Sequence, residues 1–326
     1  MRSHWQPSCN LQHLRLRAQM LASIRQFFAE RQVLEVETPL LCRATGTDPQ
    51  LDFFSTQFNL PPANPRLFLQ TSPEFAMKRL LAAGSGSIYQ ICKAFRNGET
   101  GRSHNPEFSI LEWYRLDFDL PMLMREVAEL VKTLLLSRYA QLSVVEISYQ
   151  QIFYQITGLD PLVFDLNKYQ NFAREQAWPE AQAICAEQHA IWLDFLFSHA
   201  VQPALSADQL WLIHSYPAIQ SSLARVNPLD CRVADRFEVL INGMELGNGF
   251  FELADPLEQA ARFEQEIAYR ALHGLPVVAK DEYLLDALAA GLPNCSGIAI
   301  GIDRLLMILT DCKSIDEVLA FPIQNA

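Results

Sequence analysis

Residues 95–114, FRNGETGRSHNPEFSILEWY, hold an arginine, a polar loop and a run of alternating aromatic and acidic side chains. We predict a β-hairpin with strands over residues 88–96 and 107–115. Side chains alternate between the two faces of a strand, so Phe108, Glu112 and Tyr114 share one face. If Arg96 lies on the same side of the sheet, these four residues line one pocket. The alternative is a surface hairpin with a single Arg–Glu pair.

The side chains of this hairpin suit a small charged ligand. The planar guanidinium of Arg96 can bind a carboxylate or a phosphate through parallel hydrogen bonds. Phe108 can stack on a flat ring, and Glu112 can bind an ammonium group. No Ser/His/Asp or Cys/His arrangement stands out in the sequence. Among the histidines, His104 in the loop of this hairpin is the one that we single out as a candidate.

A second predicted hairpin, RFEVLINGMELGNGFFEL (residues 236–253), turns at Asn242-Gly243. This turn would place Glu238 and Glu245 on one face as diagonal neighbours. The two carboxylates would repel each other unless a cation lay between them, and Mg²⁺ carried by a nucleotide phosphate would satisfy both. The alternative is a solvated acidic edge.

Two further features lie in the last third of the chain. Glu252 would turn inward only if Gly247 and Gly249 formed a bulge. Residues 297–304, GIAIGIDR, predict a strand, a glycine turn and a helix with Arg304 in its first turn. Together with the two hairpins, they favour a nucleoside-triphosphate site on an antiparallel sheet. Such a site suits adenylate formation, in which a carboxylate attacks the α-phosphate and pyrophosphate leaves.

Composition limits the class of protein. The chain has 326 residues, 50% of them hydrophobic and 19% charged, which indicates a globular protein with a substantial core. The N-terminus lacks an apolar signal segment, and no window is long and apolar enough for a membrane span. The seven cysteines form no CxxC pair, so reduced thiols and a cytoplasmic location are expected. The net charge of −11 argues against nucleic acid as a partner.

The remaining pattern predicts helices around the sheet. Hydrophobic spacing indicates helices over residues 14–32 and 121–139, and Ser72 can cap a helix whose first position is Pro73. Residues 140–210 mix short helices and loops without a readable motif. Hairpins with helices between them predict an α+β fold, an antiparallel sheet flanked by helices in a single domain over residues 1–326.

These motifs carry a resemblance to a known family. The chain resembles the catalytic domain of class II lysyl-tRNA synthetases over nearly its whole length, in the first helix with VLEVETP, in FRNGETGRSHNPEFSILEWY, in RFEVLINGMELGNGFFEL and in GIAIGIDRL. Those synthetases carry an N-terminal anticodon-binding OB domain, and we expect none here because the first motif begins almost at the N-terminus. The chain is similar to the paralogues of these synthetases, the elongation factor P–(R)-β-lysine ligases, in the expected lack of an OB domain and in residues 71–80, TSPEFAMKRL. That family adenylates β-lysine and transfers it to a lysine of translation elongation factor P.

The resemblance implies ATP and Mg²⁺ as cofactors, and a role for each matching residue. Arg96 would bridge the substrate carboxylate and the α-phosphate, and Arg304 would bind the γ-phosphate, as the catalytic residues. Glu238 and Glu245 would bind Mg²⁺. The amino-acid substrate would contact Ser72, Glu74, Glu112, Tyr114, Asn248, Glu252 and Ala299. ATP would contact Arg96, Asn97, His104, Asn105, Phe108, Glu245, Leu246, Gly301 and Arg304.

Two positions depart from the synthetase pattern. Gly98 stands where the synthetases have a glutamate that helps to recognise adenine, and Glu99 follows it. Ala299 stands where they have glycine, and its methyl group would disfavour an α-amino group and favour β-lysine. The alternative is a neutral exchange of small residues, although the ligase family also carries alanine here.

Three hypotheses follow. The first is an ATP-dependent ligase that acts on elongation factor P with β-lysine or lysine, and a homodimer in the manner of class II cores. The second is a truncated lysyl-tRNA synthetase that charges tRNA, which the acidic charge disfavours. The third is a catalytically inactive regulatory paralogue, which Gly98 alone supports.

Overall fold

The computed structural model describes residues 5–326, which divide into two compact units. Unit 1 comprises the described part of Met1–Ala140 together with Glu252–Ala326, and unit 2 comprises Gln141–Phe251. The chain therefore leaves unit 1, forms unit 2 and returns. The prediction of a single domain stays a prediction.

A four-stranded run of sheet forms the centre of unit 1. Its order is β1 (Leu34–Glu35), β5 (Ile88–Phe95), β6 (Glu107–Leu116) and β11 (Cys295–Gly301). The pairs β5–β6 and β6–β11 are antiparallel, as predicted, whereas β1 pairs with β5 in parallel. The sheet is therefore mixed at this edge, because the chain crosses over through residues 36–87 instead of turning in a hairpin.

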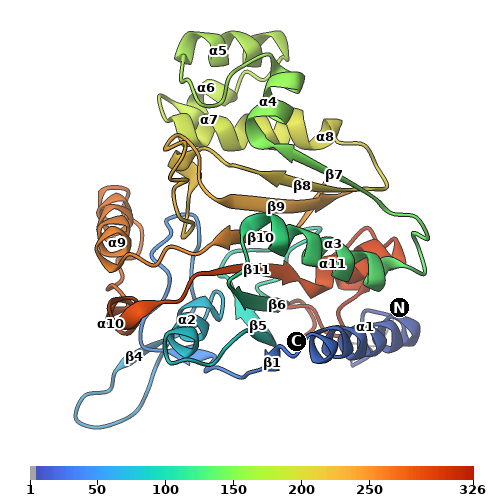
Figure 1. The fold of residues 1–326 in the computed structure, drawn as a ribbon, viewed down its shortest axis with the longest axis vertical. Helices are drawn as coiled ribbons and strands as arrows, with labels where there is room; N and C mark the ends of the chain where they lie inside the picture. Colours follow the sequence, from blue (N-terminus) through green and yellow to red (C-terminus); the bar gives the residue numbers. More distant parts are fainter. Residues whose placement is uncertain (1–4) are drawn as a thin grey trace. The chain divides into compact units, whose positions relative to one another are not determined.

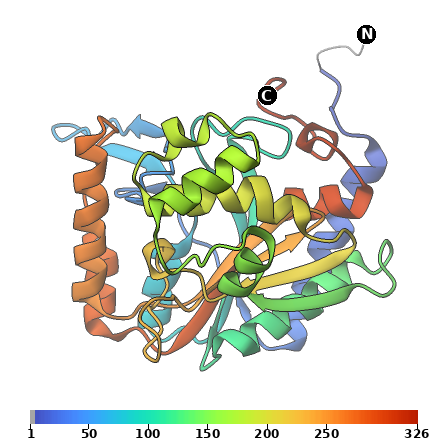
Figure 2. The same cartoon turned by 90° about the horizontal axis from the view of Figure 1, so that it is seen from above.

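Helices flank the sheet of unit 1, and a small second sheet accompanies them. Figures 1 and 2 show α1 and α9 at opposite ends of this unit. The second sheet has the order β2, β4, β3. The bounds are α1 (Leu11–Glu30), β2 (Leu41–Cys42), β3 (Ser55–Gln57), β4 (Arg66–Leu69), α2 (Glu74–Ala82), α3 (Leu120–Leu135), α9 (Pro256–Leu272), α10 (Glu282–Gly291), α11 (Ile302–Thr310) and the 3₁₀ turn η3 (Ile315–Glu317).

Aromatic side chains join α1 to the sheet. The ring of Phe28 stacks 4.4 Å from that of Tyr89 and meets Trp113 at 5.4 Å, centroid to centroid. Phe27 and Phe28 are both buried, so neither contributes to an exposed surface for dimerisation. The helix begins three residues earlier than predicted, because the side chain of Asn10 accepts the backbone N–H of His13 and caps it.

The start of α2 corrects one prediction. The helix begins at Glu74 with Pro73 as its N-cap residue, and no side-chain hydrogen bond caps it. Ser72 is therefore not the cap. Gly84 follows the end of the helix, and its φ of +85° is in the left-handed region that favours glycine.

Unit 2 combines four strands with short helices. The strand order is β10 (Met244–Phe251), β9 (Arg236–Ile241), β8 (Gln209–His214) and β7 (Ser143–Ser148), antiparallel except for the pair β7–β8. Figure 1 shows the helices gathered on one side of β7, β8 and β9. They are α4 (Tyr149–Thr157), α5 (Leu166–Glu175), α6 (Ala181–Cys185), α7 (His189–Leu196), the π-helix η1 (Phe197–Val201) and α8 (Gln202–Ala204). The 3₁₀ turn η2 (Ala218–Gln220) follows β8.

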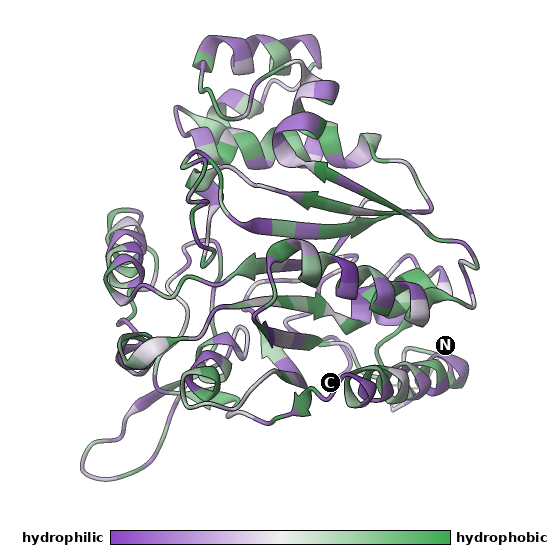
Figure 3. Cartoon of the chain, in the orientation of Figure 1, coloured by the Kyte–Doolittle hydropathy of each residue, from purple (hydrophilic) through white to green (hydrophobic). Residues whose placement is uncertain are grey.

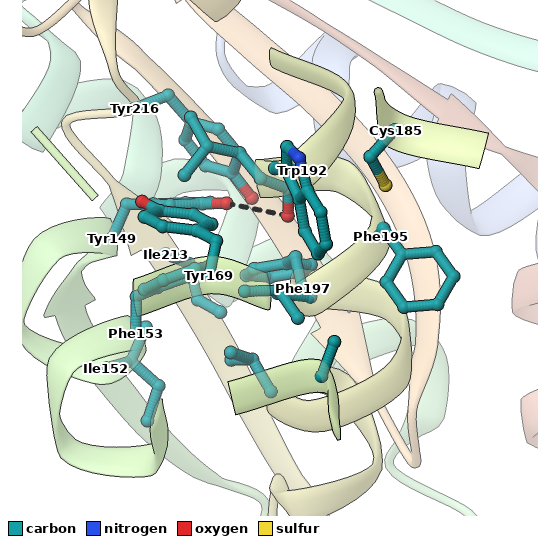
Figure 4. Packing of buried hydrophobic residues seen from close by; sticks show 14 of the residues in the cluster. Tyr149, Ile152, Phe153, Tyr169, Cys185, Trp192, Phe195, Phe197, Ile213 and Tyr216 are labelled. Atoms are coloured by element: carbon teal, nitrogen blue, oxygen red, sulfur yellow. Dashed lines mark hydrogen bonds between the residues drawn. The ribbon is translucent and has the colours of Figure 1, made fainter. Parts of the chain in front are cut away.

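A buried aromatic cluster holds these helices to the strands (Figure 4). Tyr149 stacks between Phe153 and Phe197, with centroids 5.5 and 5.2 Å away, and its hydroxyl donates to the carbonyl oxygen of Leu193. Trp192 is fully buried in the same cluster. Residues 140–210, which carried no readable motif, therefore form a well-packed core.

The hairpin of β9 and β10 has the predicted turn. Asn242 and Gly243 both have positive φ, and Met244 pairs with Ile241 and Glu245 with Leu240. Figure 3 shows hydrophilic positions interrupting the hydrophobic strand β9. The register shifts between Glu245 and Gly247, so a bulge is present with Leu246 as the extra residue. The prediction that Gly247 and Gly249 form it is wrong, because both pair in regular register, with Val239 and Phe237.

Among residues 5–326, no helix is long and apolar enough to cross a membrane. All seven cysteines are free in the structure.

Candidate active site

The first hairpin presents its functional side chains on one face. Gln90 pairs with Glu112 and Ala94 with Phe108, so the two alternating faces coincide, which the sequence had left open. The guanidinium carbon of Arg96 lies 5.1 Å from the ring centroid of Phe108. Arg96 also lies 3.6 Å from Glu99, measured between Nη1 and Oε1. The structure therefore brings a cation and an aromatic surface together.

Glu112 is a buried carboxylate with only one oxygen engaged. The hydroxyl of Tyr114 donates to its Oε1 at 2.6 Å, and its Oε2 has no hydrogen-bond partner among the described residues. Burial, and then the negative charge of Glu74, raise the pKa of Glu112 to about 8. Burial and the charge of Glu112 also raise the pKa of Tyr114, so its hydroxyl stays protonated as a donor.

Sequence reasoning missed Lys78, which the structure places among these carboxylates. Its Nζ lies 2.7 Å from Oε1 of Glu74 and 2.6 Å from Oε2 of Glu252, and its side chain is 1% exposed. Burial alone would lower the pKa of Lys78, but the charges of Glu252 and Glu74 outweigh it and raise that pKa. The spacing from Glu74 to Lys78, four residues along one helix, was the available signal.

Glu252 lies in unit 1 directly after β10. It is 3% exposed, and burial raises its pKa to about 7 in spite of the neighbouring charge of Lys78. The backbone N–H of Gly297, in β11, donates to its carboxylate. A Cβ atom at Gly297 would lie 2.4 Å from the ring of Tyr114 and 2.7 Å from Oε1 of Glu252. Only glycine fits here, because the neighbouring side chains occupy the space of a methyl group.

Ala299 lies in β11, opposite Glu112. It pairs with Glu112 across β11 and β6, so the two side chains share one face of the sheet. Ser72 is partly buried next to the N-terminus of α2. Both residues remain candidates for the substrate pocket.

Arg304 meets the loop of the first hairpin. Its Nη2 lies 2.6 Å from Nε2 of His104, and its Nε donates to the carbonyl oxygen of Ser103 at 3.3 Å. The preceding residue, Asp303, accepts a hydrogen bond from the backbone N–H of Ser109 at 2.7 Å. Gly301 ends β11 and is the N-cap residue of α11. Two candidates for ATP binding that are 200 residues apart, His104 and Arg304, are therefore in contact.

Two candidates for nucleotide binding already have structural contacts. The side chain of Asn105 is buried, donates to the carbonyl oxygen of Glu107 and accepts the backbone N–H of Ile323. Asn97 is exposed and donates to Asp52 through its side chain at 3.1 Å. Gly98 has a φ of +76°, so a glutamate side chain at this position would strain the backbone.

The acidic pair of unit 2 lies on the second hairpin. Glu238 pairs with Asn248, and Glu245 follows the turn of the same hairpin. Burial, and then the charge of Glu245, raise the pKa of Glu238 to about 7. Arg236 binds Glu238 at 2.6 Å and Oδ1 of Asn248 at 3.2 Å. Leu246 is 1% exposed, so its side chain belongs to the core.

This pair fits a cation that brings other ligands with it. Burial is the main cause of the raised pKa of Glu238 and the charge of Glu245 is the second, so the two carboxylates repel each other and a divalent cation would reduce that repulsion. Across residues 5–326, no group of three or more His, Cys, Asp or Glu side chains could hold a metal. Two carboxylates are what Mg²⁺ uses when phosphate and water supply the rest of its octahedron.

Comparison with known proteins identifies relatives of the chain. Residues 6–325 match the family of class II tRNA synthetases (D, K and N). The chain is 48% identical over 328 residues to the elongation factor P–(R)-β-lysine ligase of Vibrio parahaemolyticus, covering 100% of both chains. It is 46% identical to the ligases of that name from Haemophilus influenzae, covering 99% of each chain, and from Pasteurella multocida, covering 99% and 98%.

Proposed function

Since the chain belongs to the class II tRNA synthetase (D, K and N) family, we propose that it is an ATP-dependent ligase of the elongation factor P–(R)-β-lysine type. It activates (R)-β-lysine, or lysine, as an aminoacyl-adenylate and transfers the acyl group to a lysine side chain of translation elongation factor P. The observation that carries this proposal is the group of three carboxylates, Glu74, Glu112 and Glu252, around the buried ammonium group of Lys78. Arg96 lies over Phe108, whose side chain is on the same face of β6 as Glu112.

The amine end of the substrate is assigned to the buried acidic residues of unit 1. Glu112 offers a free oxygen, held in place by Tyr114, and Glu74 and Glu252 supply further carboxylates. Ser72 and Ala299 shape the pocket, and the methyl group of Ala299 disfavours an α-amino group. In unit 2, Asn248 is assigned to the same substrate.

The carboxylate end is assigned to Arg96. Its guanidinium orients the substrate carboxylate for attack on the α-phosphate and stabilises the negative charge that builds up there. Arg304 binds the γ-phosphate with His104, and Phe108 stacks on adenine. Further contacts to ATP are assigned to Asn97, Asn105, Glu245, Leu246 and Gly301.

ATP supplies the electrophilic phosphorus, and Mg²⁺ neutralises phosphate charge when it is bound. Glu238 and Glu245 are assigned to the metal. In the second half-reaction, the amine of the elongation factor P lysine attacks the acyl carbonyl and AMP leaves. This chemistry needs orientation and charge stabilisation more than a protein nucleophile. A homodimer and a cytoplasmic location remain predictions.

The decisive experiment measures ATP–pyrophosphate exchange with (R)-β-lysine and α-lysine in parallel, followed by transfer to purified elongation factor P. We expect exchange with (R)-β-lysine to exceed that with α-lysine, and a mass increase of the factor by one lysyl group. Arg96→Met should abolish exchange, whereas Arg66→Met, an exposed arginine of β4, should leave it intact. Charging of lysine tRNA with no transfer to the factor would favour a truncated synthetase, and no exchange with either isomer would favour an inactive paralogue.

A further inference from the structure

Lys78 is a buried cation inside a group of carboxylates. Its ammonium group contacts Glu74 and Glu252, on α2 and after β10, at 2.7 and 2.6 Å. A lysine side chain that is 1% exposed persists only when opposite charge surrounds it. Lys78 is therefore a permanent internal counter-ion of this group.

The charges of the group do not balance. One ammonium faces three carboxylates, those of Glu74, Glu112 and Glu252. Lys78 contacts two of them, and the third, Glu112, keeps an oxygen without a hydrogen-bond partner among the described residues. The fully ionised group thus carries two excess negative charges in a buried place, where an unpaired charge is costly.

We propose that Lys78 sets the charge of this pocket at two negatives, so that the pocket selects a substrate with two ammonium groups over a monoamine. The inference rests on the proposed function, because it assumes that the amine end of the substrate binds here. It assigns to Lys78 a positioning role that acts through Glu74 and Glu252. A substrate with two ammonium groups neutralises the pocket, and a monoamine leaves one carboxylate unpaired.

The titratable groups that face the pocket agree with this account. The hydroxyl of Tyr114 and the thiol of Cys295 are buried, and both have raised pKa values, so neither adds charge near neutral pH. Burial raises the pKa of Glu112 to about 8 and that of Glu252 to about 7, so these carboxylates hold protons near neutral pH unless a further cation neutralises them. A substrate with two ammonium groups would displace these protons.

A pair of variants separates charge from packing. Glu252→Gln lowers the excess of negative charge in the group from two to one. The double variant Lys78→Met/Glu252→Gln restores an excess of two, and both proteins lack the carboxylate of Glu252. Binding of 3,6-diaminohexanoate (β-lysine) and of 3-aminohexanoate, its monoamine counterpart, would be measured by calorimetry without ATP. We expect the double variant to bind the diamine about tenfold more tightly than Glu252→Gln, a change that corresponds to about one unit of pKa.

Further variants complete the test. Lys78→Met alone leaves three negative charges, one more than a diamine neutralises, so one carboxylate stays unpaired in the complex and a tenfold gain like that of the double variant should not appear. Lys78→Arg should retain the preference for the diamine. Thermal unfolding shows which variants fold, and the comparison of the double variant with Glu252→Gln still decides the question if Lys78→Met does not.

The outcomes distinguish the two proposals. Diamine binding by the double variant that is equal to or weaker than that of Glu252→Gln would overturn the role of Lys78 and leave the ligase function standing. Diamine binding that follows the predicted order, without any transfer to elongation factor P, would overturn the function alone. A wild-type protein that binds both probes equally would contradict the charge selection directly.

Discussion

Arg17 in α1 donates to the buried carboxylate of Asp303, which directly precedes Arg304 in α11. The same carboxylate accepts the backbone N–H of Ser109 in β6 through its other oxygen. One aspartate therefore ties the first helix to the strand that bears Glu112 and to the turn that bears Arg304. This link fixes the orientation of an assigned phosphate-binding residue within unit 1.

Removal of this ion pair should be costly. Arg17→Met would leave Asp303, whose side chain is 2% exposed, without its cation, and we expect a loss of about 3 kcal/mol in the free energy of unfolding. The KM for ATP should rise more than that for lysine. Arg25, also in α1, forms a half-exposed ion pair with Glu35. Arg25→Met should therefore lower the free energy of unfolding by less than about 1 kcal/mol. Denaturant unfolding of both variants measures the difference, and equal losses would contradict it.

Gly297 should tolerate no side chain. In Gly297→Ala the new methyl group would collide with the ring of Tyr114 and with Glu252, so we expect a loss of about 1–3 kcal/mol in stability and an increased KM for lysine. Gly46→Ala is the control, because its methyl group would make only an ordinary contact, at 3.6 Å from Thr71. A Gly297→Ala protein with wild-type melting temperature and KM would disprove the crowding.

Glu112 should make stability depend on pH. Its pKa of about 8 in the folded protein exceeds the ordinary 4.5, so the folded state holds a proton that the unfolded chain releases. The resulting stabilisation is complete below pH 4.5 and is lost as the pH rises through 8, with a slope of up to about 1.4 kcal/mol per pH unit. Glu112→Gln should flatten this slope between pH 5 and 8. Glu107→Gln, on the exposed start of the same strand, should not change it.

The repulsion between Glu238 and Glu245 in unit 2 should lower stability without metal and favour binding of Mg²⁺. Glu245→Gln removes a charge that raises the pKa of Glu238, so without metal the variant should be more stable than wild type at pH 8, by about 1 kcal/mol. The Mg²⁺ concentration required for pyrophosphate exchange should rise about tenfold or more. Glu175→Gln, at the exposed end of α5, serves as the control. Unchanged metal dependence would remove Glu245 from the metal site.

Local patterns predicted the parts of the fold that depend on neighbouring residues. The strands around residues 95–114, the Asn242-Gly243 turn and the shared face of Phe108 and Glu112 all follow from alternation and turn chemistry. The strands β7 and β8 were missed. Their parallel pairing joins residues about 65 apart, a relation that no local period records.

The sequence predicted individual residues of the candidate site but not how they come together. Glu74, Glu112 and Glu252 were candidates from resemblance, but their convergence on Lys78 was not visible, because a lysine at helical spacing usually stays in solvent. Ser72 was assigned as a helix cap, and the structure starts the helix one residue later than predicted, without a side-chain cap. The assigned roles themselves remain predictions that the variants above test.

The chain order of unit 1 has a consequence during synthesis on the ribosome. Strand β6 and Lys78 emerge with the first 140 residues, but β11 and Glu252 follow only after all of unit 2 has been translated. Typical elongation speeds are about 5–20 residues per second. For several seconds, the nascent chain therefore exposes the edge of β6 that later pairs with β11, and Lys78 has Glu74 but not yet Glu252 as a partner. This interval is when a holding chaperone would be needed, and truncated chains that end before residue 252 should associate with one.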